Sequence, residues 1–217
     1  MTSTSTAERP GSALPIAKRY LRRERPLSVL VAVLAVSLFV GTYLAASLLP
    51  AVVVAVLLLV ALRAPVLQSS GSIRLRTDAD PGTVADSFVG PTPPVLALQW
   101  GIADEVTSDD GTATYRISYL LGTRTAEVTV DARRETTPDG NPRIEMEITE
   151  NDEPWATYTA TVRSDDDDGT LVDVAYASDR RFGLRRLPQR FVAERYREEV
   201  LTVQGYSVVD RESRVGP

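Results

Sequence analysis

Hydrophobic residues follow two different patterns, which divide the chain near residue 72. Before that point, the 36 residues Leu27–Leu62 carry no charge and are mostly Val, Leu and Ala. As a single helix this run would measure roughly 54 Å, whereas the apolar core of a bilayer is about 30 Å thick. Two helices folded back on each other remove the mismatch. The break is expected within Leu44–Pro50, where Ser47 is a candidate N-cap and Pro50 fits only a first helical turn.

Basic residues flank this apolar run on both sides. Five of them lie between residues 16 and 25, and Arg63, Arg74 and Arg76 follow the run. Positive flanks are typical of cytoplasmic loops, so we predict a two-span membrane hairpin with the N-terminus and the C-terminal domain both cytoplasmic. One long tilted helix with an external domain remains an alternative. We divide this part into a disordered tail (1–15), a basic flank with a two-helix membrane anchor (16–66) and a linker (67–72).

Beyond the linker the period changes to two, which is typical of strands. Ile73 and Leu75 open the pattern, and Asp80-Pro81 predicts the start of one short helix that ends at Gly90. We expect Val95–Val106 to be a strand. Apolar and polar residues then alternate in successive segments, whose inward positions are Tyr115, Ile117, Tyr119, Ala126, Val128, Val130, Ile144, Met146, Ile148, Ala156, Tyr158, Ala160, Val162, Val172, Val174 and Tyr176. This pattern predicts an antiparallel sheet with one dry face.

A helix is predicted after the sheet. It follows Leu187-Pro188, has apolar positions at 192, 196, 200 and 203, and stops at Gly205. A sheet with one dry face needs a cover, and this is the one long helix available. The predicted fold class is therefore α+β, with a domain at 73–211 and a tail at 212–217.

The composition excludes much familiar enzymology. The chain has no Cys and no His, and Lys18 is its only lysine. Thiol nucleophiles, imidazole bases, Cys-ligated zinc and a P-loop lysine are therefore absent. Residues 1–76 carry a net charge of +7 and residues 77–217 a net charge of −12. The acidic, arginine-rich domain is typical of a salt-adapted protein.

The order of elements resembles the helix-grip fold of START-like proteins, the SRPBCC superfamily. The resemblance covers about Ser72–Arg211 and depends on a strand, a helical break, a run of antiparallel strands and the ending Gly169–Tyr176, Arg185–Gly205. The sequence departs from the family by having one short helix in the break, where the family usually has two. The resemblance implies a curved sheet around the terminal helix, with a cavity between them for an apolar ligand. Its members include lipid carriers, hormone receptors and aromatic cyclases.

Candidate ligand-binding residues come from the predicted dry face and its cover, with Tyr hydroxyls as hydrogen-bond anchors. They are Tyr115, Tyr119, Met146, Tyr158, Tyr176, Phe191 and Tyr196. The same residues also fit a completely filled core, and that alternative stays open. Alternation sends Glu145, Glu147 and Asp173 outward, so no catalytic residue is assigned. The acidic tip at 165–168 lacks the first and twelfth ligands of a calcium loop, and we expect neither a metal nor a cofactor.

A basic cluster precedes and enters the last helix. Arg180, Arg181, Arg185, Arg186 and Arg190 are its first members, and residues 180–197 carry a net charge of +6. Contact with anionic lipid head groups is one interpretation, and ion pairing with the domain's own acids is another. Nucleic-acid binding is disfavoured, because aromatic residues such as Phe182 and Phe191 are few among these arginines.

These observations predict a membrane-anchored module that binds an apolar or lipid-like ligand. Its partners would be membrane lipids, a small apolar molecule or a membrane protein. A scaffold subunit with a filled core is the first alternative, and a cyclase or hydratase is the second. Since no catalytic group stands out, the sequence favours a protein that is not an enzyme.

Overall fold

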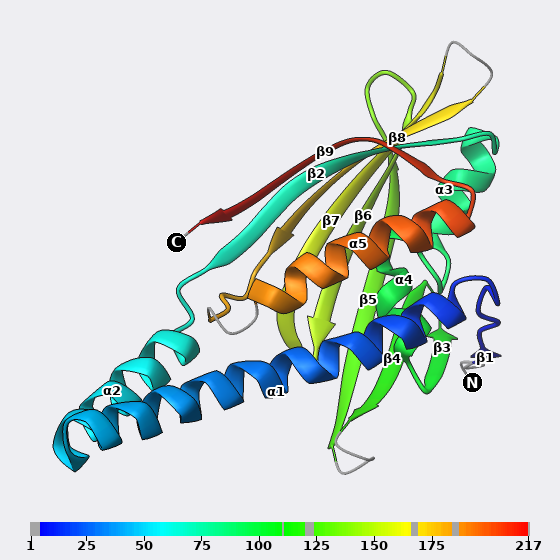
Figure 1. Cartoon of the computed structure of the whole chain (residues 1–217). Coiled ribbons are helices and arrows are strands. Elements are labelled where there is room, and N and C mark those ends of the chain that lie inside the picture. The colour runs from blue at the N-terminus through cyan, green and yellow to red at the C-terminus, as the bar shows by residue number, and fades with distance from the viewer. Residues whose placement is uncertain (1–4, 110, 120–123, 166–168, 184–186, 217) are drawn as a thin grey trace.

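The computed structural model describes residues 5–109, 111–119, 124–165, 169–183 and 187–216. After a short first strand, two helices form a hairpin whose far end extends away from the rest of the chain (Figure 1). Helix α1 (Leu14–Ala45) and helix α2 (Leu48–Arg63) meet at Ala46 and Ser47, so the predicted break between two helices is confirmed. Within the part of the chain that the structure describes, no helix is both long enough and apolar enough to cross a bilayer.

The rest of the chain is built on one antiparallel sheet with the strand order β1-β3-β4-β5-β6-β7-β8-β2-β9. The sheet curves around the helices that cover its inner face (Figure 1). Consecutive strands from β3 to β8 are neighbours, and β2 returns to pair with β8. The strands are β1 (Ser5–Thr6), β2 (Gln68–Thr77), β3 (Glu105–Asp109), β4 (Thr112–Tyr119), β5 (Arg124–Thr136), β6 (Pro142–Glu150), β7 (Glu153–Ser164), β8 (Thr170–Ser178) and β9 (Ser207–Gly216).

The predicted alternation describes the sheet well. Side chains at inward positions of β5 to β8 are buried, apart from the half-buried Tyr176, and Val130, Met146 and Val172 are at most 1% exposed. Tyr119, at the end of β4, is an exception, because its side chain is 41% exposed. The predicted dry face therefore exists, although it ends before Tyr119.

Helical segments cover the dry face. They are α3 (Pro81–Val89), the 3₁₀ turn η1 (Pro94–Leu96), α4 (Ala97–Ile102) and α5 (Leu187–Val203). Helix α3 begins as predicted, with the Asp80 carboxylate accepting a hydrogen bond from the backbone N–H of Thr83 at 2.9 Å. The helical segment between β2 and β3 thus contains two α-helices, α3 and α4, where the sequence predicted one. This agrees with the two helices that the helix-grip order usually has there.

The predicted strand over Val95–Val106 is wrong for most of its length. Residues 94–102 are helical, and only the last two belong to β3. Pro93 and Pro94 open the turn, and the Trp100 indole N–H donates to the carbonyl of Pro93 at 2.9 Å. Because all residues of 93–98 are buried, this segment has no polar face that would reveal a helical period.

Helix α5 ends as predicted. Gly205 adopts a φ of +85°, and the N–H of Tyr206 donates to the Leu201 carbonyl at 3.0 Å. The predicted apolar stripe needs one correction, since Val203 is 43% exposed whereas Leu201 is fully buried. The helix therefore packs through two faces rather than one.

The N-terminal segment, predicted as a disordered tail, is packed where the structure describes it. Strand β1 pairs with β3, and the N–H of Ala7 donates to Val106 at 3.0 Å. Ala13, Ile16 and Ala17 are buried against the domain. A Cβ built on Gly101 would lie 2.7 Å from the Ala17 Cβ, so α1 approaches α4 at close range. The first half of α1 thus belongs to the domain.

Two other predicted connections are part of the sheet. The linker at 67–72 supplies the first residues of β2, and the tail at 212–217 supplies the last residues of β9. Leu67 exchanges two backbone hydrogen bonds with Phe182, at 2.7 and 3.1 Å. A side chain at Gly183 would overlap the backbone carbonyl of Leu62. The hairpin is therefore joined to the domain at both of its ends.

Candidate functional site

A slot lies between α5 and the edge of the sheet. Its enclosed volume is about 10 Å³, which is room for about one water molecule. Strands β2, β7, β8 and β9 form one wall, and α5 with η1 forms the other. The lining residues are Ser72, Ile73, Val95, Tyr158, Val174, Tyr176, Glu194, Arg197, Leu201 and Arg211.

Strand register explains why Arg211 reaches this slot. Ile73 is opposite Val174 on one side and opposite Arg211 on the other. Cross-strand partners point to the same face of a sheet, and Ile73 is buried on the inner face. The inner face therefore continues onto β9, where a cation takes the position of an apolar residue.

The next cross-strand row brings two predicted Tyr residues together. Tyr158 is opposite Tyr176, and their rings stack with centroids 5.7 Å apart at 25°. Tyr176 is in turn opposite Gly71, where an added Cβ would lie 2.8 Å from the Tyr176 hydroxyl oxygen. The Tyr176 phenol thus lies over Gly71, in space that any side chain at position 71 would occupy. A larger residue there would displace the Tyr176 ring.

The polar groups of the slot are two arginines and one carboxylate. Glu194 and Arg197 share one face of α5 with Leu201, at spacings of three and four residues. Nη2 of Arg211 is a buried nitrogen without a hydrogen-bond partner. Among the described residues, neither Arg197 nor Arg211 forms a side-chain ion pair.

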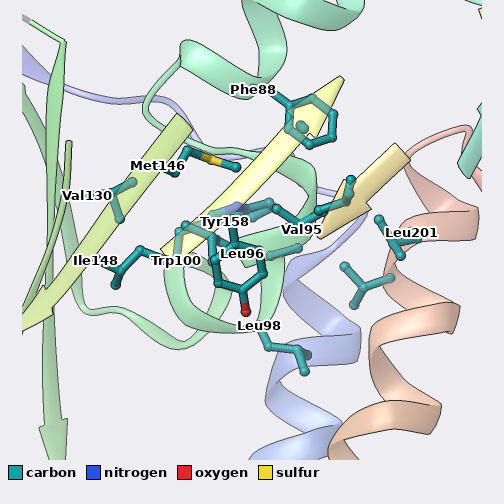
Figure 2. Packing of buried hydrophobic residues seen from close by; sticks show 14 of the residues in the cluster. Phe88, Val95, Leu96, Leu98, Trp100, Val130, Met146, Ile148, Tyr158 and Leu201 are labelled. Carbon is teal, nitrogen blue, oxygen red and sulfur yellow. The ribbon is translucent and has the colours of Figure 1, made fainter. Parts of the chain in front are cut away.

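Away from the slot, helical segments fill the interior. Figure 2 shows Phe88, Leu96, Leu98 and Trp100 packed with Val130 and Met146 of the sheet. Trp100 is fully buried. A ligand held in the middle of the sheet would have to displace the segment at 94–102. The predicted apolar cavity stays a prediction, and the described packing favours a filled core here.

Tyr115 illustrates how this interior uses polar atoms. Its side chain is fully buried, and its hydroxyl donates to the Pro91 carbonyl at 3.1 Å. Burial raises the pKa of the Tyr115 phenol above its ordinary value. The hydroxyl therefore anchors the loop after α3, which is a structural contact rather than an opening toward a ligand.

The predicted ligand-binding residues do not form one site. Tyr158 and Tyr176 line the slot, whereas Tyr115 and Met146 are in the filled core. Tyr196 contacts Tyr20 of α1 edge to face, with centroids 5.9 Å apart. Tyr119 lies on the surface, and the side chain of Phe191 is outside the described residues.

The predicted lipid-contact arginines are described only in part. Arg180 is held at the β6–β7 turn, where it pairs with Glu150 at 2.6 Å and Glu153 at 2.9 Å. It also donates to the Pro154 carbonyl at 3.1 Å, which favours the structural interpretation for this residue. Arg181 is exposed. Arg185, Arg186 and the side chain of Arg190 lie outside the described residues.

Sequence reasoning missed Arg211 as a site residue. Strand β9 reads Ser-Val-Val-Asp-Arg-Glu-Ser-Arg-Val-Gly and lacks the apolar alternation of the other strands. One signal was available: β9 begins directly after Gly205, where helix α5 ends, and a chain leaving that helix can return to the open edge of the sheet.

Comparison with known proteins gives distant likenesses only. No family model matches the chain, and no curated protein matches it. Solved structures that resemble it include Mll3558 from Rhizobium loti, at 22% identity and a TM-score of 0.39, covering 64% of this chain and 98% of that one. Ara h 8.0201 matches at 8% identity and a TM-score of 0.34, covering 61% and 97% of the two chains. CalU16 from Micromonospora echinospora matches at 13% identity and a TM-score of 0.27, covering 64% and 84%.

TM-scores this low carry no argument about fold or function. The helix-grip arrangement is defined instead by this chain's own strand order, with β2 beside β8, two α-helices between β2 and β3, and α5 laid over the inner face.

Proposed function

We propose that this chain is a membrane-attached scaffold module, in which the apolar hairpin enters a lipid bilayer and holds a filled helix-grip domain beside it. The hairpin's exposed apolar surface carries the proposal. Among the side chains that the structure describes between Leu30 and Val60, sixteen large apolar ones are each at least 43% exposed, and Leu44 reaches 78%. Such a surface exceeds the roughly 300–600 Å² that is usual for the largest apolar patch of a soluble monomer.

Lipid is the occupant that best fits this surface. The exposed residues are almost entirely Val, Leu and Ala and are spread along both helices, which is typical of a segment surrounded by hydrocarbon rather than of one groove for one partner. Lys18 and Arg19 are exposed on α1 before the apolar part begins. Cations at that position favour anionic lipid head groups and a cytoplasmic face.

The domain's role as a scaffold is supported by its packing and its tethering. Its described interior is filled, so binding by a partner at the surface needs no internal rearrangement. The hairpin is fixed to the domain at two places, through α1 on α4 and α5 and through the Leu67–Phe182 bridge. A partner bound to this domain would be held in a constant orientation toward the bilayer.

Cysteine labelling tests the attachment, since the chain has no Cys of its own. Ser47→Cys places one thiol at the hairpin tip, and Ser213→Cys places one on β9. If the hairpin inserts as the sequence predicts, with two spans and both ends cytoplasmic, a membrane-impermeant maleimide will label the first variant in intact cells and the second only after lysis. Labelling of both in intact cells, or release of the chain from membranes by alkaline carbonate, would refute the proposal.

A second candidate function is binding of a small lipid-like ligand at the slot. The observation in its favour is that Tyr158 and Tyr176, predicted from the sequence as ligand contacts, line the slot together with apolar residues of β2, β8, η1 and α5. Because the enclosed volume is small, the ligand would insert only one end.

A further inference from the structure

We propose that the slot recognises the carboxylate of a molecule with an apolar tail, and that Arg211 is the residue that binds it. The proposal rests on the second candidate function and specifies its ligand. It depends on three observations: an unpartnered buried nitrogen, the balance of charge in the slot, and the apolar character of the remaining wall.

The unpartnered nitrogen is the first observation. Nη2 of Arg211 is buried and has no acceptor, although buried polar atoms in proteins are nearly always hydrogen-bonded. A buried donor without an acceptor costs free energy, and the cost is larger for a charged group. Arg211 is nevertheless held on the inner face by its place opposite Ile73. A guanidinium in this position is suited to an oxyanion, because its planar donors match the two oxygens of a carboxylate.

Charge balance is the second observation. Arg197 and Arg211 bring two positive charges into the slot, and Glu194 brings one negative charge. One positive charge is left uncompensated among the lining residues. A monoanion neutralises it, whereas a doubly charged phosphate would leave a net negative charge beside Glu194. The lining therefore favours a carboxylate over a phosphate group.

The third observation is the wall around these charges. Val95, Val174 and Leu201 contribute aliphatic side chains, and the stacked rings of Tyr158 and Tyr176 contribute aromatic surface. The enclosed volume of about 10 Å³ admits only a group of about the size of one water. A carboxylate oxygen fits this space, while the tail lies outside it against the half-buried ring of Tyr176.

Calorimetric titration of the full chain in nanodiscs tests the proposal, with empty nanodiscs as the blank. The probes are octanoate, which has a carboxylate and an apolar tail, 1-octanol, which has the same tail without a charge, and inorganic phosphate, which is an anion without a tail. We expect the Kd of octanoate to be at least about tenfold lower than that of octanol, and phosphate to bind more weakly than octanoate. Arg211→Gln should abolish the preference for octanoate and leave octanol binding unchanged.

Arg214→Gln is the matched control, because Arg214 lies on the same strand but its side chain is 83% exposed. It should keep the preference for octanoate. Equal binding of octanoate and octanol would overturn the carboxylate assignment and leave ligand binding at the slot intact. Binding of neither would overturn both, and a single water would then satisfy Arg211. Phosphate binding as tight as octanoate, or equal effects of the two substitutions, would also overturn the proposal.

Discussion

Replacing Trp100 by Ala removes the largest fully buried side chain that the structure describes. Truncations of this kind cost about 3–5 kcal/mol of unfolding free energy, because they combine lost transfer free energy with a cavity. The lost indole hydrogen bond adds little, since the Pro93 carbonyl still accepts from the N–H of Leu96 at 3.0 Å. We therefore expect a loss of about 4 kcal/mol, a large share of the roughly 5–15 kcal/mol of a typical domain.

Urea unfolding in detergent micelles measures this loss. The chain has only two tryptophans, so Trp155 alone reports on the domain in the Trp100→Ala protein. Trp155→Ala is the control, with Trp100 as its reporter. Because Trp155 is half-buried on β7, its removal should lower the free energy of unfolding by distinctly less. The slope against urea should stay unchanged for both proteins, as for substitutions that alter stability alone.

A loss of less than about 1 kcal/mol for Trp100→Ala would refute the reasoning, because so small a value belongs to a side chain that is not tightly packed. It would mean that residues 94–102 do not fill the space between the helices and the sheet. The same result would support a ligand cavity at the centre of the domain, and so would weaken the scaffold proposal.

Two further predictions concern the sheet and the tyrosines. Burial raises the pKa of the phenols of Tyr115 and Tyr206, because the folded state favours the neutral phenol. The folded state therefore keeps its full stability below about pH 10, the ordinary pKa of a tyrosine. It loses stability as the pH rises further and the phenols ionise on unfolding. Urea midpoints should fall above about pH 10, and less so in Tyr115→Phe; equal falls would contradict this. Gly71→Ala should lower Tm, because the added Cβ would overlap the backbone carbonyl of Glu212 and would also meet the Tyr176 hydroxyl. Gly11→Ala, in open space, should leave Tm unchanged; equal effects on Tm would show that the space at Gly71 is not needed.

The strands were predictable because their pattern is local. In a pleated strand each side chain faces opposite to its neighbour, so Ile144, Met146 and Ile148 indicate a buried face without knowledge of their partners. All three are at most 2% exposed. The hairpin was predictable for a similar reason, since the length of an uncharged run limits how it can be folded.

Segments whose environment comes from distant parts of the chain were not predictable. Residues 94–102 are helical, and all of them except the half-buried Gln99 and Ile102 are buried, so they carry little periodic signal. Ala17 is buried where α4 offers Gly101 at the contact, and this glycine lies far away in the sequence. Arg211 reads as a surface residue on a charged strand, and only its pairing with Ile73 brings it to the inner face.

Helix α5 lies between the helical hairpin and the slot, so both candidate sites depend on the position of this helix. One side of the helix contacts α1, through the Arg19–Glu199 ion pair at 2.8 Å and the contact of Tyr20 with Tyr196. The other side presents Glu194, Arg197 and Leu201 to the slot. A substitution that displaces α5 from α1 would thus move a wall of the slot as well. Variants at the hairpin tip and on β9 lie outside the α1–α5 contact, so each can report on its own site.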